Sequence, residues 1–148
     1  MKKVFFALFL VSSATFAQHR AQNQPPVTVQ RSFERENAGS NNATWMKTSN
    51  QWHANYRDNN NHNVDAYYDR NGRRVDTHRE VDRREVPQNV DSRLNSMYHA
   101  NGNYKAIKIE RPNSQPLFQI QIQSGSSRNR TIYMDEQGRT RSYNDRHR

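Results

Sequence analysis

Apolar and polar residues alternate along several stretches of the chain, with the two-residue period of a strand that buries one face. The clearest example is 51–57, where the apolar positions are Trp52, Ala54 and Tyr56. Short polar segments typical of hairpin turns separate it from its neighbours. The pattern predicts antiparallel strands at 44–46, 51–57, 63–69, 73–77, 104–109, 117–123, 130–135 and 139–143.

Two other segments carry apolar residues four apart, which places them on one face of a helix. The first opens at Pro26 and the second at Pro87. Proline is favoured in a first helical turn, where its missing N–H is not needed. The apolar positions of the two predicted helices are Val29, Phe33, Val90, Leu94 and Tyr98.

A phrase from the first half of the chain returns 66 residues later. Residues 66–73 read AYYDRNGR and residues 132–139 read IYMDEQGR, and the same offset carries the strand at 51–57 onto 117–123. A repeat of this kind indicates one supersecondary unit built twice. The expected fold is α+β: a tandem repeat of one helix plus a four-stranded antiparallel sheet, with the helices packed on one sheet face. Such a scaffold favours binding over catalysis.

The first 17 residues have the form of a secretory signal peptide. Lys2 and Lys3 precede an unbroken apolar run at 4–11, and 15–17 offers a small-residue cleavage site. The run is too short to span a bilayer, which takes about 20 residues. We therefore expect cleavage after Ala17, no membrane span, and a periplasmic or secreted protein.

The remaining boundaries follow from the same patterns. A polar leader precedes one domain, which divides into two repeats and a charged connection, and a basic tail follows it. The predicted parts are the leader 18–25, the domain 26–143 with repeat one 26–77, linker 78–85 and repeat two 86–143, and the tail 144–148.

The chain is strongly basic, with 23 Lys and Arg against 14 Asp and Glu, and it has no cysteine. Its stability therefore cannot rest on disulfides. A net charge of +9 attracts anionic partners, although such charge is also typical of a solvated surface. Arginines interleaved with Tyr133 and Tyr143 offer a polyanion site for anionic glycan or nucleic acid. These arginines are Arg128, Arg130, Arg139 and Arg141.

Several motifs occur in a recognisable order: a proline-opened helix, a tryptophan strand, and a strand pair ending in Tyr-Asp-x-x-Gly, followed by a second such unit. The residues are Phe33, Trp45, Trp52, Ala54, 67–72, 86–87, Val90, Tyr98 and 133–138. This order, over 27–143, resembles the PepSY-like, β-lactamase-inhibitor-like (BLIP-like) proteins exported by Bacteroidetes. The resemblance implies paired helix-plus-sheet repeats, in a family whose members mostly have no assigned function. The present chain differs in being basic and rich in Asn and Gln.

If the apolar positions face the helices, the opposite sheet face is rich in tyrosines and amides. Tyrosine offers a large contact area at low entropy cost, and Asn and Gln offer adaptable hydrogen bonds. This face is the predicted binding surface, and a solvated face with no partner is the plain alternative. Asp65 and Thr131 lie on the same face, and the binding candidates are His53, Asn55, Tyr67, Gln119, Gln121, Gln123 and Tyr133.

The sequence gives little support for metal, cofactor or catalytic chemistry. His53, His62, His78 and His99 have no paired spacing of the kind that zinc sites use. Cysteine nucleophiles, HExxH and Gly-x-Ser-x-Gly motifs and phosphate-binding loops are all missing from the sequence. We therefore expect no cofactor and no enzyme activity, although a site assembled from distant segments, as in an undetected hydrolase, stays open as an alternative.

Together these observations predict an exported, non-catalytic binding module, inhibitor-like in fold, that captures an envelope protein or glycan through the sheet face opposite the helices. The first alternative is a cationic surface or matrix protein that holds anionic glycan or nucleic acid.

Overall fold

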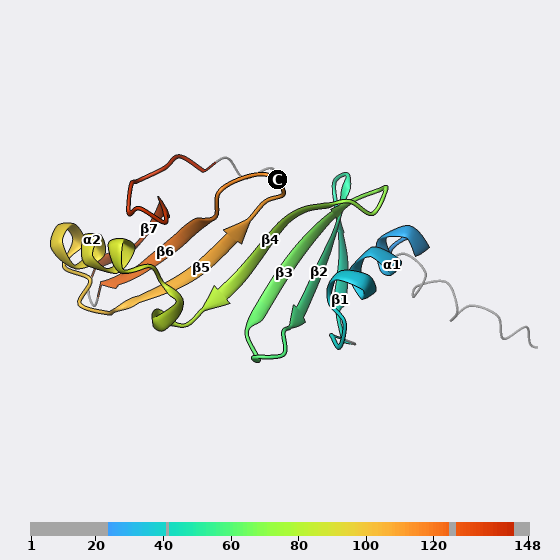
Figure 1. Cartoon of the computed structure of the whole chain (residues 1–148), viewed down its shortest axis with the longest axis horizontal. Coiled ribbons are helices and arrows are strands. Elements are labelled where there is room, and N and C mark those ends of the chain that lie inside the picture. The colour runs from blue at the N-terminus through green and yellow to red at the C-terminus, as the bar shows by residue number, and fades with distance from the viewer. Residues whose placement is uncertain (1–23, 41, 125–126, 144–148) are drawn as a thin grey trace, which may run out of the picture.

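The computed structural model describes residues 24–40, 42–124 and 127–143. The predicted signal peptide, most of the leader and the basic tail lie outside these residues. The elements are α1 (Val27–Glu36), β1 (Thr44–Thr48), β2 (Gln51–Arg57), β3 (Asn63–Asp69), β4 (Arg74–Val81), the 3-10 helix η2 (Arg83–Glu85), α2 (Gln88–Tyr98), β5 (Tyr104–Glu110), β6 (Leu117–Ser124) and β7 (Ser127–Asp135), as Figure 1 shows.

Over the described ranges, seven strands form a single antiparallel sheet in chain order, from β1 to β7. The two helices lie towards opposite ends of this sheet (Figure 1). The predicted α+β class and antiparallel sheet are confirmed. The prediction of two four-stranded sheets is wrong, because β4 pairs with both β3 and β5 and so joins the halves.

Both helices begin directly after the predicted prolines. The carbonyl of Pro26 accepts the N–H groups of Val29 and Gln30 at 2.9 and 3.0 Å, which starts α1. In α2 the carbonyl of Pro87 accepts the corresponding N–H groups, also at 2.9 and 3.0 Å. Each proline is thus the last extended residue before a helix, where its lack of an N–H removes no helical bond.

The N-terminal core lies between α1 and the first strands. Val29 and Phe33, four apart on α1, are 0% and 5% exposed and pack against the alternating apolar positions of β2 and β3. The predicted burial of the tryptophan in β2 is confirmed. The strand residues of this cluster are Trp52, Ala54, Tyr56, Val64, Ala66 and Tyr68.

The C-terminal core lies between α2 and the last strands. Val90 and Leu94 are both fully buried and occupy positions on α2 that correspond to Val29 and Phe33 on α1. The strand residues of this cluster are Val81, Ala106, Phe118, Ile120, Ile122, Ile132 and Met134.

Between the two cores, the helix-side face of β4 and β5 is polar. Arg79 lies opposite Val64 on β3 and opposite Lys108 on β5, so all three side chains share that face. Thr77 lies opposite Glu110 in the same way. The two apolar clusters are therefore separate, and the backbone pairing of β4 with β5 joins them.

β4 is longer than its sequence predicted. The alternation favoured a strand at 73–77 and a linker at 78–85, whereas β4 continues to Val81 and η2 follows it. Val81 lies opposite Ala106 and is only 6% exposed. Burial of this one side chain, together with the pairing with β5, explains why charged residues predicted to be a linker form a strand.

The repeated phrase is a turn that both halves build alike. Oδ1 of Asp69 accepts the backbone N–H groups two and four residues later at 2.8 and 2.9 Å, and Oδ1 of Asp135 does the same at 3.1 and 3.0 Å. The backbone closes each turn at Gly72 and Gly138, whose φ angles are +81° and +75°. An Asn-Gly pair such as 71–72 is typical of a hairpin turn with positive φ angles at both residues, but here only the glycine has one.

Each of these glycines also lies against the first turn of a helix. A Cβ on Gly72 would stand 2.7 Å from the carbonyl oxygen of Thr28 in α1, and one on Gly138 would stand 2.7 Å from that of Asn89 in α2. Only glycine fits both the backbone angle and the close approach. The Asp-x-x-Gly phrase therefore docks each hairpin onto its helix.

Candidate functional site

The predicted binding residues share the sheet face that points away from α1 and α2, called here the open face. Residues that lie directly opposite one another on paired strands project to the same side of a sheet. His53 lies opposite Tyr67, and Gln119 lies opposite Tyr133. The alternation therefore placed these side chains on the correct side of the sheet, and their role in binding stays a prediction.

At the N-terminal end of the open face, an imidazole and a phenol form a flat platform. The rings of His53 and Tyr67 are stacked, with centroids 4.7 Å apart and planes at 8°. Oδ1 of Asp65 lies 2.7 Å from Nε2 of His53 and accepts the amide of Asn55 at 2.8 Å. Burial opposes ionisation of Asp65, but these hydrogen bonds outweigh it and lower its pKa. The platform is thus held in place by an ionised carboxylate.

The middle of the open face contains a buried ion pair. Asp76 on β4 is 1% exposed, and its Oδ2 accepts Nε–H of Arg111 at 3.0 Å. Nε2 of His78 lies 3.5 Å from its Oδ1. Burial opposes ionisation of Asp76, yet the bonds from His78 and Arg111 hold its pKa below the usual range. These three residues were not predicted as site residues. His78 falls in the predicted linker 78–85, and Arg111 lies between strands.

The chain itself covers part of this face. After β7 the segment 139–143 was predicted to be a strand, but it contributes a single bridge, from Thr140 to Met134. Two backbone bonds form this bridge: Asp135 N–H to the Arg139 carbonyl at 3.0 Å and Arg141 N–H to the Tyr133 carbonyl at 2.8 Å. The segment then brings Tyr143 back towards the middle of the sheet. The predicted fourth strand of the second unit is therefore wrong, because the segment crosses the face instead of extending the sheet.

Tyr143 joins the C-terminal end of the open face to its middle. Its ring stacks on Tyr133 with centroids 4.7 Å apart, and the guanidinium of Arg111 lies 4.7 Å from its centroid on another side. Its hydroxyl lies 3.1 Å from Nε2 of His78. Ile109, directly opposite His78 and on this same face, is only 2% exposed.

A shallow pocket remains on the open face beside the platform. Its volume is about 240 Å³, and it crosses from β3 to β6. It combines two carboxylates, an imidazole, a lysine and two amides around one apolar side chain. The lining residues are Asn63, Asp65, His78, Glu80, Lys105, Ile107 and Gln121.

The arginines predicted to hold a polyanion do not gather on one surface. Arg139 and Arg141 both contact Oδ2 of Asp135, at 2.8 Å each. Arg130 lies opposite Ile122 on the helix-side face, where its guanidinium is 4.9 Å from the ring centroid of Tyr98. The side chain of Arg128 lies outside the described part of the structure. The remaining binding candidates, Asn55 and Gln123, are exposed on the open face.

The fold is shared with solved structures from Bacteroides. A DUF2874 family protein of Bacteroides ovatus ATCC 8483 has a TM-score of 0.72 at 20% identity, covering 80% of this chain and 85% of that chain. A protein of Bacteroides eggerthii DSM 20697, proposed to be periplasmic, has a TM-score of 0.73 at 16% identity, covering 79% and 86%. A BLIP-like protein of Bacteroides fragilis NCTC 9343 has a TM-score of 0.69 at 15% identity, covering 87% and 92%.

Neither a family model nor a curated protein matches the sequence. Similarity at such low identity shows a fold and does not transfer an activity. In the described ranges, no helix is long and apolar enough to cross a membrane. The resemblance seen in the sequence is thus confirmed only for the BLIP-like fold: this chain has the fold of these Bacteroides proteins, which include a BLIP-like protein.

Proposed function

We propose that this protein is an exported, non-catalytic module that binds an envelope protein or a glycan through its open face. The observation that carries the proposal is the stacked pair of His53 and Tyr67, fixed by Asp65 and adjoining a pocket of about 240 Å³. An aromatic surface that is already ordered loses little entropy when a partner covers it.

The ionisation of the open face supports binding more than proton transfer. Asp65 and Asp76 both have lowered pKa values and both contact a histidine. A general acid needs a raised pKa so that it still carries a proton near neutral pH. Carboxylates of this kind instead orient neighbouring donors. An undetected hydrolase is the alternative that an activity panel on glycan and peptide substrates would expose.

The fold and the charge support a more specific form of the proposal. The matching turns at Asp69 and Asp135, each docked on a helix, support kinship with PepSY-like tandem repeats. The periplasmic proposal for one structural neighbour and the BLIP-like fold of another support export and an inhibitor-like mode of contact. The excess of positive charge, which remains when Lys2 and Lys3 of the predicted signal peptide are removed, would steer an acidic partner towards the surface.

The test is capture of partners by the mature chain, together with matched variants. Tyr67→Ala removes one ring of the platform, whereas Met97→Ala changes a side chain that is 52% exposed on α2, on the other side of the sheet. We expect capture from envelope extract or a glycan array to fall at least tenfold for Tyr67→Ala, an order-of-magnitude hot-spot effect, and to stay unchanged for Met97→Ala.

Tyr133→Ala should give a smaller loss, because Tyr143 already covers that ring. The same measurements at two salt concentrations separate the alternatives. If capture falls steeply as the salt concentration rises, the protein is a cationic binder of polyanions. If capture depends only weakly on salt, binding through the open face is favoured. Unchanged capture by a folded Tyr67→Ala variant would contradict the proposal.

A further inference from the structure

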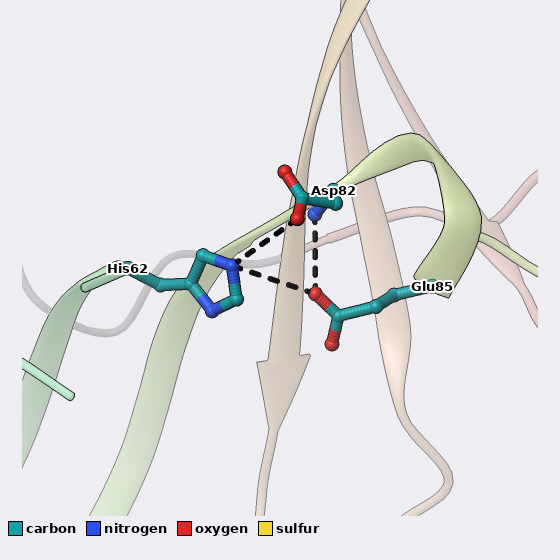
Figure 2. A group of neighbouring side chains, drawn as sticks. All are labelled: His62, Asp82 and Glu85. Atoms are coloured by element: carbon teal, nitrogen blue, oxygen red, sulfur yellow. Dashed lines mark hydrogen bonds and ion pairs between the residues drawn. The ribbon is translucent and has the colours of Figure 1, made fainter. Parts of the chain in front are cut away.

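Away from the open-face platform, three metal-ligating side chains converge where the two halves of the chain meet. His62 lies just before β3, Asp82 follows β4, and Glu85 ends η2. One donor atom from each lies within 4.8 Å of the other two. Figure 2 shows the imidazole of His62 pointing at the two carboxylates. The sequence does not predict this group, because His62 is far from Asp82 and Glu85 along the chain.

The distances from the His62 imidazole to the two carboxylates are too long for hydrogen bonds and close to those between two ligands of a bound cation. Nε2 of His62 lies 3.6 Å from Oδ2 of Asp82 and 3.7 Å from Oε1 of Glu85. An N–H···O bond needs about 2.7–3.2 Å. Two ligands of a tetrahedral Zn²⁺, each about 2.1 Å from the ion, stand about 3.4 Å apart. A shift of a few tenths of an ångström would bring each of these two oxygens to that distance from Nε2.

A carboxylate behind the imidazole prepares it for this role. Oδ2 of Asp58 lies 3.3 Å from Nδ1 of His62, and Oδ1 of Asp58 is fixed by the backbone N–H groups of Asn60 and His62 at 2.9 Å each. A metal-bound histidine usually donates its other ring N–H to such a group, which leaves Nε2 free to bind.

The acidic ligands are also held in position. Oε1 of Glu85 accepts the backbone N–H of Asp82 at 3.2 Å, and Oε2 of Glu85 accepts a bond from Arg79 at 2.8 Å. Arg79 lies 3.2 Å from Nδ1 of His62 as well, so it competes with Asp58 for that nitrogen. Its charge lowers the affinity for a cation, and the three carboxylates offset it.

We propose that His62 Nε2, Asp82 and Glu85 bind one divalent transition cation of the Zn²⁺ class. Mixed nitrogen and oxygen ligands suit such ions, and three protein ligands leave a coordination position for water or a partner group. The three residues line a surface pocket of about 510 Å³ together with Asn60 and Arg84, which gives that position access to solvent. The site would connect the β2–β3 loop to the segment between β4 and α2.

The test uses the mature chain without an affinity tag, with Zn²⁺ alone as the probe. Calorimetry measures stoichiometry and affinity, and NMR of the imidazole nitrogens identifies the histidine that binds. We expect one equivalent to bind, His62→Gln to abolish that binding, and Asp82→Asn and Glu85→Gln each to weaken it at least tenfold. Asp58→Asn, which keeps an oxygen for the turn, should weaken it about 10–100-fold, as losses behind a metal ligand do.

The matched control is His53→Gln. His53 also contacts a carboxylate, Asp65, at 2.7 Å, but it is not part of the converging trio. Its binding should equal that of the unmodified chain. The assignment is overturned if folded His62→Gln or Glu85→Gln binds Zn²⁺ as tightly as the unmodified chain, or if His53→Gln loses the binding. Glu85→Gln keeps an acceptor for the Asp82 N–H, so it tests the site even if His62→Gln does not fold.

Discussion

The two halves of the molecule share one backbone frame, made of the helix starts and the Asp-x-x-Gly turns, but their hydrophobic cores differ. In the N-terminal half the core is aromatic: Phe33 meets the rings of Trp45 and Tyr56 edge-on at 5.3 and 5.0 Å. In the C-terminal half the core is mostly aliphatic, and Leu94 and Met134 are both fully buried. The helix starts and the Asp-x-x-Gly turns nevertheless correspond. The repeated phrase therefore specifies the frame, and the packing inside it is free to differ.

The aromatic core carries polar groups that need partners, and the end of α1 supplies them. The Tyr56 hydroxyl donates to Oδ1 of Asn37 at 2.6 Å, and the Tyr68 hydroxyl lies 3.3 Å from Oε2 of Glu36. Burial raises the pKa of Tyr56 to about 12. The aliphatic core makes one comparable link, from the Tyr104 hydroxyl to Asp91 on α2 at 2.6 Å. The N-terminal half thus depends on both packing and hydrogen bonds, and the C-terminal half depends mainly on packing.

The largest expected effects come from truncating one helix anchor in each half. Phe33→Ala should lower the free energy of unfolding by about 3–5 kcal/mol and Leu94→Ala by about 2–5 kcal/mol. Because β4 pairs with β5, we expect each variant to shift one common transition. Trp45 and Trp52 both lie in the N-terminal half, so tryptophan fluorescence follows that half and far-UV circular dichroism follows the whole chain.

Coincident transitions by the two signals would show that the separate cores unfold as one unit. If Leu94→Ala lowers the midpoint seen by circular dichroism and leaves the fluorescence midpoint unchanged, the halves unfold independently. That result would reduce the β4–β5 pairing to a connection without cooperativity.

An effect no larger than that of Leu94→Ala is expected at the turns, which are the same in both halves. Gly72→Ala and Gly138→Ala should each cost about 1–2 kcal/mol for the left-handed backbone and a further 1–3 kcal/mol, roughly, for crowding the helix carbonyl. Gly39→Ala is the matched control: its φ is +97°, but the nearest atom to a new Cβ is 3.5 Å away. Urea unfolding should therefore rank Gly39→Ala well above the other two in stability. Equal losses at all three glycines would show that the turns do not press on the helices.

Much of the frame could be predicted because it is local. Two-residue alternation placed His53 and Tyr67 on one face and Trp52 on the other, and the prolines marked both helix starts. The end of β4 could not be predicted from the same pattern. Residues 78–85 are dominated by charge, and their strand forms because Val81 reaches a core supplied mainly by residues later in the chain.

The candidate site divides in the same way. The platform of His53 and Tyr67 follows from the alternation of side chains along two strands, which can be recognised in the sequence. The middle of the site does not: Tyr143 reaches His78 and Asp76 across 65 and 67 residues, through a segment that crosses the sheet. The trio around His62 is likewise formed by tertiary contact. Such contacts produce no characteristic spacing in the sequence, because His62 and the two acidic ligands come from separate segments of the chain.

The smallest expected difference between the halves is in how much stability each loses at low pH. Burial opposes ionisation of Asp135, yet the N–H of Arg139 and the guanidinium groups of Arg141 and Arg139 lower its pKa to about 2. The pKa of Asp69 is also lowered, by backbone bonds and by Arg73 alone among the arginines, and its side chain is 27% exposed against 3% for Asp135. Both carboxylates therefore stabilise the fold above their unfolded pKa, near 3.9. This stability is lost as the pH falls through the folded pKa of each, which for Asp135 is about 2.

Asp135→Asn should remove more of this acid sensitivity than Asp69→Asn, because two arginines lose their partner instead of one. Asparagine keeps an oxygen for the backbone N–H groups, so both turns should persist at neutral pH. The measurement is the urea midpoint of each variant between pH 2 and pH 7, relative to the unmodified chain. If the plots of urea midpoint against pH coincide for Asp69→Asn and Asp135→Asn, the two halves are electrostatically alike. The second arginine beside Asp135 would then add no stability that depends on the charge of the carboxylate.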